Sequence, residues 1–174
     1  MEKKPDIIQT ERLTLKAFTE GHRQAMLGIL FDKDIKKTYM LPDFDTPEQA
    51  GPLFEKLMQF SRSDNHFVYG ICLNDTPIGF VNDCEITDSA IELGYVIAPA
   101  YQGKGFATEA VRACIDALFD MGFEEVKAGF FEENIASGRV MKKCGMVKMD
   151  FEEDIEYKGT LRHCLYYHIT KTKS

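Results

Sequence analysis

The hydrophobic and polar positions in the first part of the chain predict one strand followed by two helices. In residues 11–18, Leu13 and Leu15 alternate with polar side chains, which is typical of a half-buried strand. Residues 19–30 carry apolar side chains at helical spacing. Residues 46–60 begin with Thr-Pro, a favourable helix start, and Pro52 inside the pattern indicates that the first turn is separate or kinked.

The middle and the end of the chain predict six more strands and two more helices. Three strand-like runs separated by short turns lie at 66–73, 78–86 and 90–98, and such short turns predict an antiparallel meander. Apolar residues at intervals of three and four then predict a helix over 107–121 that ends at Gly122. The remaining predicted elements are a strand at 126–131, a short helix at 134–145, and two strands on either side of a Lys-Gly turn.

This order of elements predicts an α/β fold in which one mixed, mostly antiparallel sheet is flanked by about four helices. With 174 residues and neither an internal repeat nor a linker, the chain is expected to form a single domain over residues 1–174.

Charge and cysteine content narrow the functional classes. The formal net charge of −7 argues against a nucleic-acid-binding protein. It suits a cationic substrate, and it equally suits a surface charged only for solubility. The five cysteines are scattered and form no C-x-x-C pair, and the four histidines are not spaced as zinc ligands. We therefore expect no disulfide scaffold, no metal, and a reducing cytoplasm as the location.

Membrane association is not expected either. The N-terminus lacks the apolar segment of a signal peptide, and no apolar run is long enough to span a bilayer.

The stretch YVIAPAYQGKGFATEAVRACIDAL, residues 95–118, joins an apolar strand to an amphipathic helix through two glycines. It is not a Walker loop, because Lys104 is followed by Gly105, and it is not a dinucleotide fingerprint, because the third glycine position is Thr108. Gly103 and Gly105 permit a tight bend, and the helix that follows presents free N–H groups. Together with Lys104 these groups suit a pyrophosphate, although a tight turn that uses glycine only for its geometry would look the same.

Three motifs in the same order resemble the GNAT-type N-acetyltransferases, in particular their ribosomal-protein N-terminal acetyltransferase (RimJ/RimL-like) branch. QGKGFA, residues 102–107, is similar to the Q/R-x-x-G-x-G/A signature of acetyl-CoA binding. TERLTLKAF near the start and ENIASGRVMKKCGM later extend the resemblance over residues 10 to about 168.

The resemblance implies the GNAT acyl-CoA N-acyltransferase fold and a binding site for acetyl-CoA. Loop amides would hold the pyrophosphate while Gln102 braces the loop, and the strand would splay near Gly94 so that its backbone binds the pantetheine arm. A glycine inside a strand marks a bulge or a close approach, or serves packing alone. The residues expected to bind acetyl-CoA are Tyr95, Val96, Ile97, Gln102, Gly103, Lys104, Gly105, Phe106, Ala107, Thr108 and Asn134.

The acceptor amine must lose a proton before it attacks the thioester. At neutral pH this costs ~4.6 kcal/mol for a lysine-like amine and about 1.4 kcal/mol for an N-terminal amine. Glu92, two residues before Gly94 on the same strand face, is the candidate general base. The alternatives for Glu92 are an exposed strand glutamate or one that only orients the substrate.

The later helix carries the candidates for the leaving group. Asn134 is expected to contact pantetheine, to cap the helix, or both. Many relatives place a tyrosine acid seven residues later, where this chain has Met141, so Ser137 becomes the candidate donor to the sulfur, unless the thiolate leaves without an acid. Cys144 is expected in the core rather than as a nucleophile.

Other polar and aromatic residues have weaker assignments. Lys142 and Lys143 either hold the adenosine 3′-phosphate or form a solvated helix face, and Tyr39, Met40 and Phe44 are expected near the acceptor.

The resemblance thus implies direct attack of an amine on acetyl-CoA in a ternary complex. The amine belongs to a protein N-terminus or to a small molecule, and the protein is a monomer or a homodimer. Two alternatives stay open: a CoA-binding regulator without turnover, and an acetyltransferase for a polyamine or aminoglycoside.

Overall fold

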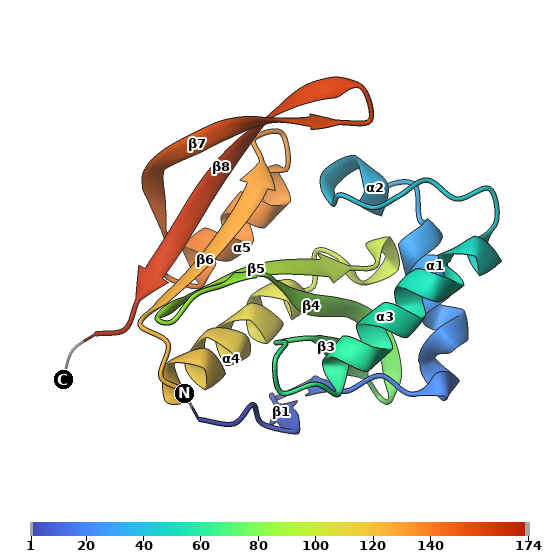
Figure 1. The fold of residues 1–174 in the computed structure, drawn as a ribbon, viewed down its shortest axis with the longest axis horizontal. Coiled ribbons are helices and arrows are strands. Elements are labelled where there is room, and N and C mark those ends of the chain that lie inside the picture. The colour runs from blue at the N-terminus through green and yellow to red at the C-terminus, as the bar shows by residue number, and fades with distance from the viewer. Residues whose placement is uncertain (1, 173–174) are drawn as a thin grey trace.

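The structure is a computed structural model, and it describes residues 2–172. One eight-stranded sheet runs through the molecule in the order β1-β2-β3-β4-β5-β6-β8-β7 (Figure 1). The strands are β1 (Ile7–Gln9), β2 (Thr14–Lys16), β3 (Tyr69–Leu73), β4 (Thr76–Ile86), β5 (Ala90–Ile97), β6 (Glu125–Phe131), β7 (Val147–Tyr157) and β8 (Thr160–Thr170). Neighbouring strands pair antiparallel except β5 and β6, which are parallel.

Five helices cover the two faces of the sheet. They are α1 (Arg23–Phe31), α2 (Ile35–Thr38), α3 (Gly51–Ser61), α4 (Phe106–Asp120) and α5 (Ile135–Lys143). Residues of α4 and α5 pack into one apolar core with Leu15, Ile71 and Leu93 of the sheet. Residues of α1 and α3 form a second core on the opposite face with Val68, Phe80 and Val96. Side chains alternate between the two faces of the sheet along each strand, so each face contributes to its own core.

The parallel strands β5 and β6 stay together over only a short distance. Their register joins Ala90 to Glu125, Ile91 to Val126 and Glu92 to Lys127. Beyond Glu92, β5 continues beside β4 and β6 continues beside β8, so the two strands part. A register shift in β4 between Asp83 and Glu85 lies opposite this point, and such a bulge bends and twists its strand.

Gly94 follows directly on the parting, but the bulge is in β4 rather than at this glycine. A Cβ at Gly94 would lie 2.9 Å from the hydroxyl oxygen of Tyr39 and 3.1 Å from Sγ of Cys84. Of the predicted explanations for Gly94, the structure therefore supports the close approach.

The predicted elements agree with the structure except in two places. The sequence pattern did not predict β1 or the single turn of α2, which are too short to show a period. The expected break near Pro52 is present, because a separate 3-10 turn at Pro47–Ala50 precedes α3.

The β7–β8 hairpin fastens the chain segment 36–41, here called the α2 loop. The hydroxyl of Tyr157 at the end of β7 donates a hydrogen bond to the Lys36 carbonyl at 2.7 Å and accepts one from the Leu41 amide at 3.3 Å. Arg162 of β8 donates to the Lys37 carbonyl at 3.0 Å. The α2 loop is therefore held from the far half of the sheet.

No helix within residues 2–172 is both long enough and apolar enough to cross a membrane.

Candidate active site

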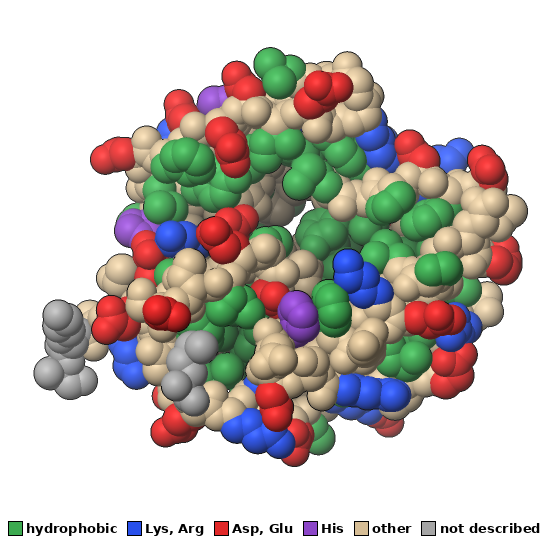
Figure 2. All heavy atoms as spheres, viewed as in Figure 1, with side chains coloured by type: hydrophobic (Ala, Val, Ile, Leu, Met, Phe, Trp, Pro, Cys, Tyr) green, Lys and Arg blue, Asp and Glu red, His purple; other side chains and the backbone are tan. Residues whose placement is uncertain are grey.

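A cleft of about 410 Å³ lies where β5 and β6 part. Its walls come from the free edge of β5, the turn and first residues of α4, and the length of α5, with further residues from β6 and from the region of α2. Figure 2 shows a hollow on the viewed face, between the β7–β8 hairpin and the region of α2, with hydrophobic side chains around it. This hollow is in the part of Figure 1 where β5 and β6 separate.

The turn before α4 has the geometry of an anion-binding loop. Gly103 has a φ of 72° and Gly105 a φ of 81°, a region that side chains with a Cβ rarely adopt. Both glycines line the cleft together with Phe106, Ala107 and Thr108. Within the described chain, no side chain caps the first amides of α4, which leaves these N–H groups and the positive end of the helix dipole for a ligand.

Gln102 braces this turn as expected, since its Nε2 donates a hydrogen bond to the Ile97 carbonyl at 2.8 Å. The Lys104 ammonium lies elsewhere than expected. It donates to the Ala100 carbonyl at 3.1 Å and sits 5.6 Å from the centre of the Tyr101 ring. Lys104 is not among the residues that line the cleft. In this structure its backbone therefore forms part of the turn, but its charge does not face the cleft.

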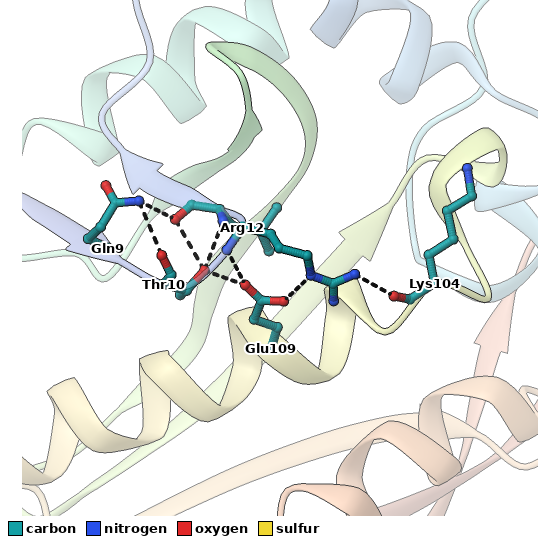
Figure 3. A network of polar contacts seen from close by, with 6 residues as sticks. Gln9, Thr10, Arg12, Lys104 and Glu109 are labelled. Carbon is teal, nitrogen blue, oxygen red and sulfur yellow. Dashed lines mark hydrogen bonds and ion pairs between the residues drawn. The ribbon is translucent and has the colours of Figure 1, made fainter.

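A polar network that the sequence reasoning missed fixes the same turn from outside (Figure 3). The Arg12 guanidinium pairs with Glu109 in the first turn of α4 at 2.7 Å and donates to the Lys104 carbonyl at 3.0 Å. Thr10 adds a hydrogen bond to Glu109 at 2.6 Å. Burial raises the pKa of Glu109, but the hydrogen bonds from Thr10 and Arg12 outweigh it and lower that pKa. The only sequence signal was the TER motif, and nothing in it identifies a partner 97 residues away.

Only part of the predicted β5 edge faces the cleft with its backbone. The Ala98 amide donates to the Ile78 carbonyl, so residue 98 bonds toward β4. Because peptide groups alternate along a strand, Val96 also bonds toward β4, whereas Tyr95 and Ile97 face the gap. The Val96 amide and carbonyl are therefore used within the sheet, and its buried side chain belongs to the core on the α1–α3 face. Val96 also lines the cleft, and its contact with the acetyl-pantetheine arm stays a prediction. The Tyr95 amide is left as the candidate donor to a thioester carbonyl.

Glu92 is the last residue at which β5 pairs with β6, and it faces Lys127 in register. Its side chain is partly buried. Burial raises the pKa of Glu92, the nearby Glu85 and Glu153 carboxylates raise it further, and Lys127 opposes this. A carboxylate with a raised pKa accepts a proton at neutral pH more readily than an ordinary one. Glu92 does not line the cleft itself but lies on the same strand face as Gly94.

The start of α5 brings two predicted residues together. Asn134 caps the helix, because its Oδ1 accepts a hydrogen bond from the Ser137 amide at 3.3 Å. Its Nδ2 donates to Ser137 Oγ at 2.9 Å, which leaves the Ser137 hydroxyl proton free to donate into the cleft. Met141 also lines the cleft, is 1% exposed, and has no proton to give.

The cations of the cleft come from one face of α5. Arg139 and Lys143 line it, whereas Lys142 does not. The i, i+4 spacing puts Arg139 and Lys143 on the same side of the helix, so the pattern could have pointed to Arg139. These two side chains provide positive charge that suits phosphate groups.

The remaining candidates are placed as follows. Cys144 is 8% exposed and burial raises its pKa to about 11, which fits a core thiol rather than a nucleophile. Tyr39 lines the far end of the cleft and its hydroxyl donates to Asn82 Oδ1, whereas Phe44 packs into the core on the α1–α3 face. In the described part of the chain, no three His, Cys, Asp or Glu side chains are grouped so that they could hold a metal.

Comparison with known proteins identifies relatives of the whole domain. A family model described as Acetyltransferase (GNAT) domain matches residues 12–147. The chain is 30% identical over 171 residues to the Uncharacterized N-acetyltransferase YnaD of Bacillus subtilis, and the match covers 92% of this chain and 94% of YnaD. It is 26% identical over 165 residues to YoaA of the same organism, which is also described as an N-acetyltransferase, with coverage of 92% and 88%.

The fold is shared with solved structures. RimJ of Mycobacterium smegmatis in complex with CoA-disulfide matches with a TM-score of 0.83 and 19% identity, covering 98% of this chain and 90% of RimJ.

Proposed function

Because the chain belongs to the GNAT acetyltransferase family, we propose that it moves an acetyl group from acetyl-CoA to a primary amine by direct attack in a ternary complex. Family membership makes the protein an acetyl-CoA-dependent acyltransferase. The observation that carries the proposed mechanism is the parting of β5 from β6 directly beside the uncapped glycine turn.

The described residues fit acetyl-CoA along the whole cleft. The amides of residues 103–108 and the N-terminus of α4 would bind the pyrophosphate, with Arg139 and Lys143 near the other phosphate. The edge of β5 at Tyr95 and Ile97 would pair with the amide groups of pantetheine, as a neighbouring strand would. RimJ of Mycobacterium smegmatis was solved with a CoA-disulfide, which supports a CoA site in this fold.

Three groups of the chain would then serve the transfer: Tyr95 and Ser137, which line the cleft, and Glu92, which lies two residues before Gly94 on the same strand face. The carboxylate of Glu92, directly or through a water molecule, takes the proton of the attacking amine. The Tyr95 amide donates to the carbonyl oxygen that gains negative charge as the C–N bond forms. When the C–S bond breaks, the Ser137 hydroxyl donates a hydrogen bond to the departing sulfur, in place of the tyrosine acid that Met141 precludes.

Replacing Gly105 tests the site assignment. Gly105→Ala puts a Cβ at a φ of 81° and 3.4 Å from the Arg12 guanidinium, so we expect the Kd for CoA to rise at least tenfold in calorimetric titration. Gly122→Ala is the matched control. It places a Cβ at a φ of 101° at the other end of α4, where nothing lies within 4 Å, and should lower stability while leaving CoA affinity unchanged. Unchanged CoA affinity in folded Gly105→Ala would contradict the assignment.

A thiol-release assay tests the reaction itself. Peptides with free N-termini, polyamines and amino sugars are offered with acetyl-CoA, and release of CoA thiol that depends on an amine is the expected result. Tight CoA binding without release across this panel would instead support a CoA-binding regulator.

A further inference from the structure

A second cavity, of about 380 Å³, lies between α3, the α2 loop and strand β4. Its walls are mainly apolar and include Leu41, Leu53, Leu57, Phe60, Val68 and Phe80. Val68 and Phe80 are each 1% exposed, so the floor of the cavity is part of the core on the α1–α3 face. A concave, largely apolar space of this size is typical of a site for a small organic group.

This cavity meets the coenzyme cleft at Tyr39, which lines both. The Tyr39 hydroxyl donates to Asn82 Oδ1, and Asn82 also lines the second cavity. Gly94 provides the room for this arrangement, since a Cβ there would lie 3.2 Å from Asn82 Oδ1 as well as 2.9 Å from the tyrosine oxygen. The next residue is Tyr95, whose amide faces the gap. Among the described residues, Tyr39 is the one that lines both spaces, and Gly94 lies directly beside its hydroxyl.

Charged side chains also line the cavity. The Asp83 carboxylate lies beside Asn82, accepts a hydrogen bond from the Phe67 amide at 2.8 Å, and lies 3.0 Å from His66 Nδ1. The His66 ring stacks on Phe60, and the Lys56 ammonium sits 5.3 Å from the centre of the Phe60 ring. The Asn82–Asp83 side therefore offers acceptor oxygens to an ammonium group, whereas Leu53 and Leu57 of α3 offer an apolar wall.

We propose that this cavity is an acceptor pocket for a primary amine that carries one bulky apolar or aromatic group. The apolar group fills the space between α3 and β4, and the nitrogen lies at the Tyr39–Gly94 end, toward the thioester and Glu92. This inference rests on the proposed acetyl transfer. It specifies the substrate class through the pocket's shape, and it gives Gly94 and Tyr39 the role of keeping the pocket next to the cleft.

Pairs of substrates that differ in a phenyl group test this inference. With acetyl-CoA saturating, kcat/KM for 2-phenylethylamine should exceed that for ethylamine at least tenfold, because an apolar pocket stabilises a buried phenyl group. Phenylalanyl-glycine amide, compared with glycyl-glycine amide, tests whether the pocket also binds a phenyl group that belongs to an N-terminal residue. Spermidine tests the opposite case of a purely cationic acceptor.

A variant whose larger side chain fills the pocket provides a second test. Leu53→Trp should reduce the 2-phenylethylamine to ethylamine ratio at least tenfold, mainly through KM, while the Kd for CoA stays unchanged. Gln59→Trp is the control, because Gln59 lies on the same helix but is exposed and does not line the pocket. It should leave the ratio as it is.

The outcomes separate this inference from the reaction. Amine-dependent thiol release that favours ethylamine or spermidine, or a ratio that Leu53→Trp does not change, overturns the acceptor pocket and leaves the acetyl transfer standing. If no amine releases thiol, the proposed reaction fails. Saturation-transfer NMR of 2-phenylethylamine then tests binding to the pocket independently of the reaction. The pocket is supported if 2-phenylethylamine binds the wild type and Gln59→Trp but not Leu53→Trp. It is overturned if 2-phenylethylamine does not bind the wild type.

Discussion

At the scale of single residues, the environment of Glu92 decides whether this carboxylate can serve as a base. Its pKa is raised because the side chain is partly buried and because Glu85 and Glu153 lie nearby. The folded state therefore binds the Glu92 proton more tightly than the unfolded state does. Stability from this group is largest below the unfolded pKa and falls as the pH rises through the folded pKa, so the ionised carboxylate is a cost to the fold at neutral pH.

Glu92→Gln should therefore separate activity from stability. We expect kcat/KM to fall by about 100-fold or more at neutral pH, because the amine loses its proton acceptor. The free energy of unfolding at pH 7 should rise, because the buried charge is removed, and this gain should shrink as the pH falls below the ordinary carboxyl pKa. Thiol release over a pH series and urea unfolding at two pH values measure the two effects.

Glu85→Gln is the matched variant, since Glu85 is exposed and pairs in register with Glu92 across β4 and β5. Removal of the neighbouring charge should lower the pKa of Glu92 and move the acid limb of the kcat/KM profile to lower pH without abolishing turnover. An acid limb that stays in place in both variants would exclude Glu92 as the base.

Glycines were the residues that the sequence predicted best. Gly103 and Gly105 were singled out because a tight bend requires conformations that other residues avoid, and both have positive φ. The Arg12–Glu109 pair could not be predicted, because a salt bridge between residues far apart in the chain leaves no local pattern. The charge of Lys104 was misplaced for a similar reason, since only the folded turn reveals that its ammonium bends back to Ala100.

At the scale of elements, long periodic segments were predictable and their mutual arrangement was not. The meander β3–β5 and the helices α3, α4 and α5 follow from apolar spacing, whereas β1 and α2 are too short for a period. The order of β6, β8 and β7 in the sheet, and the place where β5 leaves β6, depend on pairing between distant segments. The glycine turn before α4 was therefore predicted, and Tyr39 and Met40 were expected near an acceptor, but the walls that α3 and β4 give to the second cavity were not predicted.

Tyr157→Phe tests how the β7–β8 hairpin controls the α2 loop. The variant removes the hydroxyl that bonds to Lys36 and Leu41, and leaving these backbone groups without that partner should cost about 1–2 kcal/mol of stability. Amide exchange in residues 36–41 should accelerate. Because Tyr39 lies in this loop, KM for the acceptor should rise several-fold while CoA affinity is kept.

Tyr167→Phe serves as the control for that experiment, because the Tyr167 ring packs on Phe130 in the core on the α4–α5 face. It should leave amide exchange in the α2 loop unchanged. Equal exchange rates in wild type and Tyr157→Phe would show that the hairpin does not hold the loop.

At the scale of the whole molecule, the sheet consists of two parts that pair with each other at residues 90–92. The helix α4, which packs on both β5 and β6, and the bonds from the β7–β8 hairpin to the α2 loop also join them. A molecule of CoA bound in the cleft would contact both parts. Ligand at 100 times its Kd should stabilise the protein by about 2.7 kcal/mol, which corresponds to a rise in Tm of about 5–10 °C for a domain of this size.

Differential scanning calorimetry over a series of CoA concentrations measures this shift. Gly105→Ala, with its weaker CoA binding, should need proportionally more CoA for the same rise. A Tm that is independent of CoA would mean that the ligand does not bind the folded cleft.

The unpaired edge of β5 also affects how the protein behaves when no ligand is bound. Free main-chain donors and acceptors along a strand are a template on which the strand of another molecule can add, and this is a common route to aggregation. Pantetheine paired along Tyr95 and Ile97 would mask that template. Occupancy by the coenzyme would thus protect the chain against self-association, and heated samples should stay clear longer with CoA than without it.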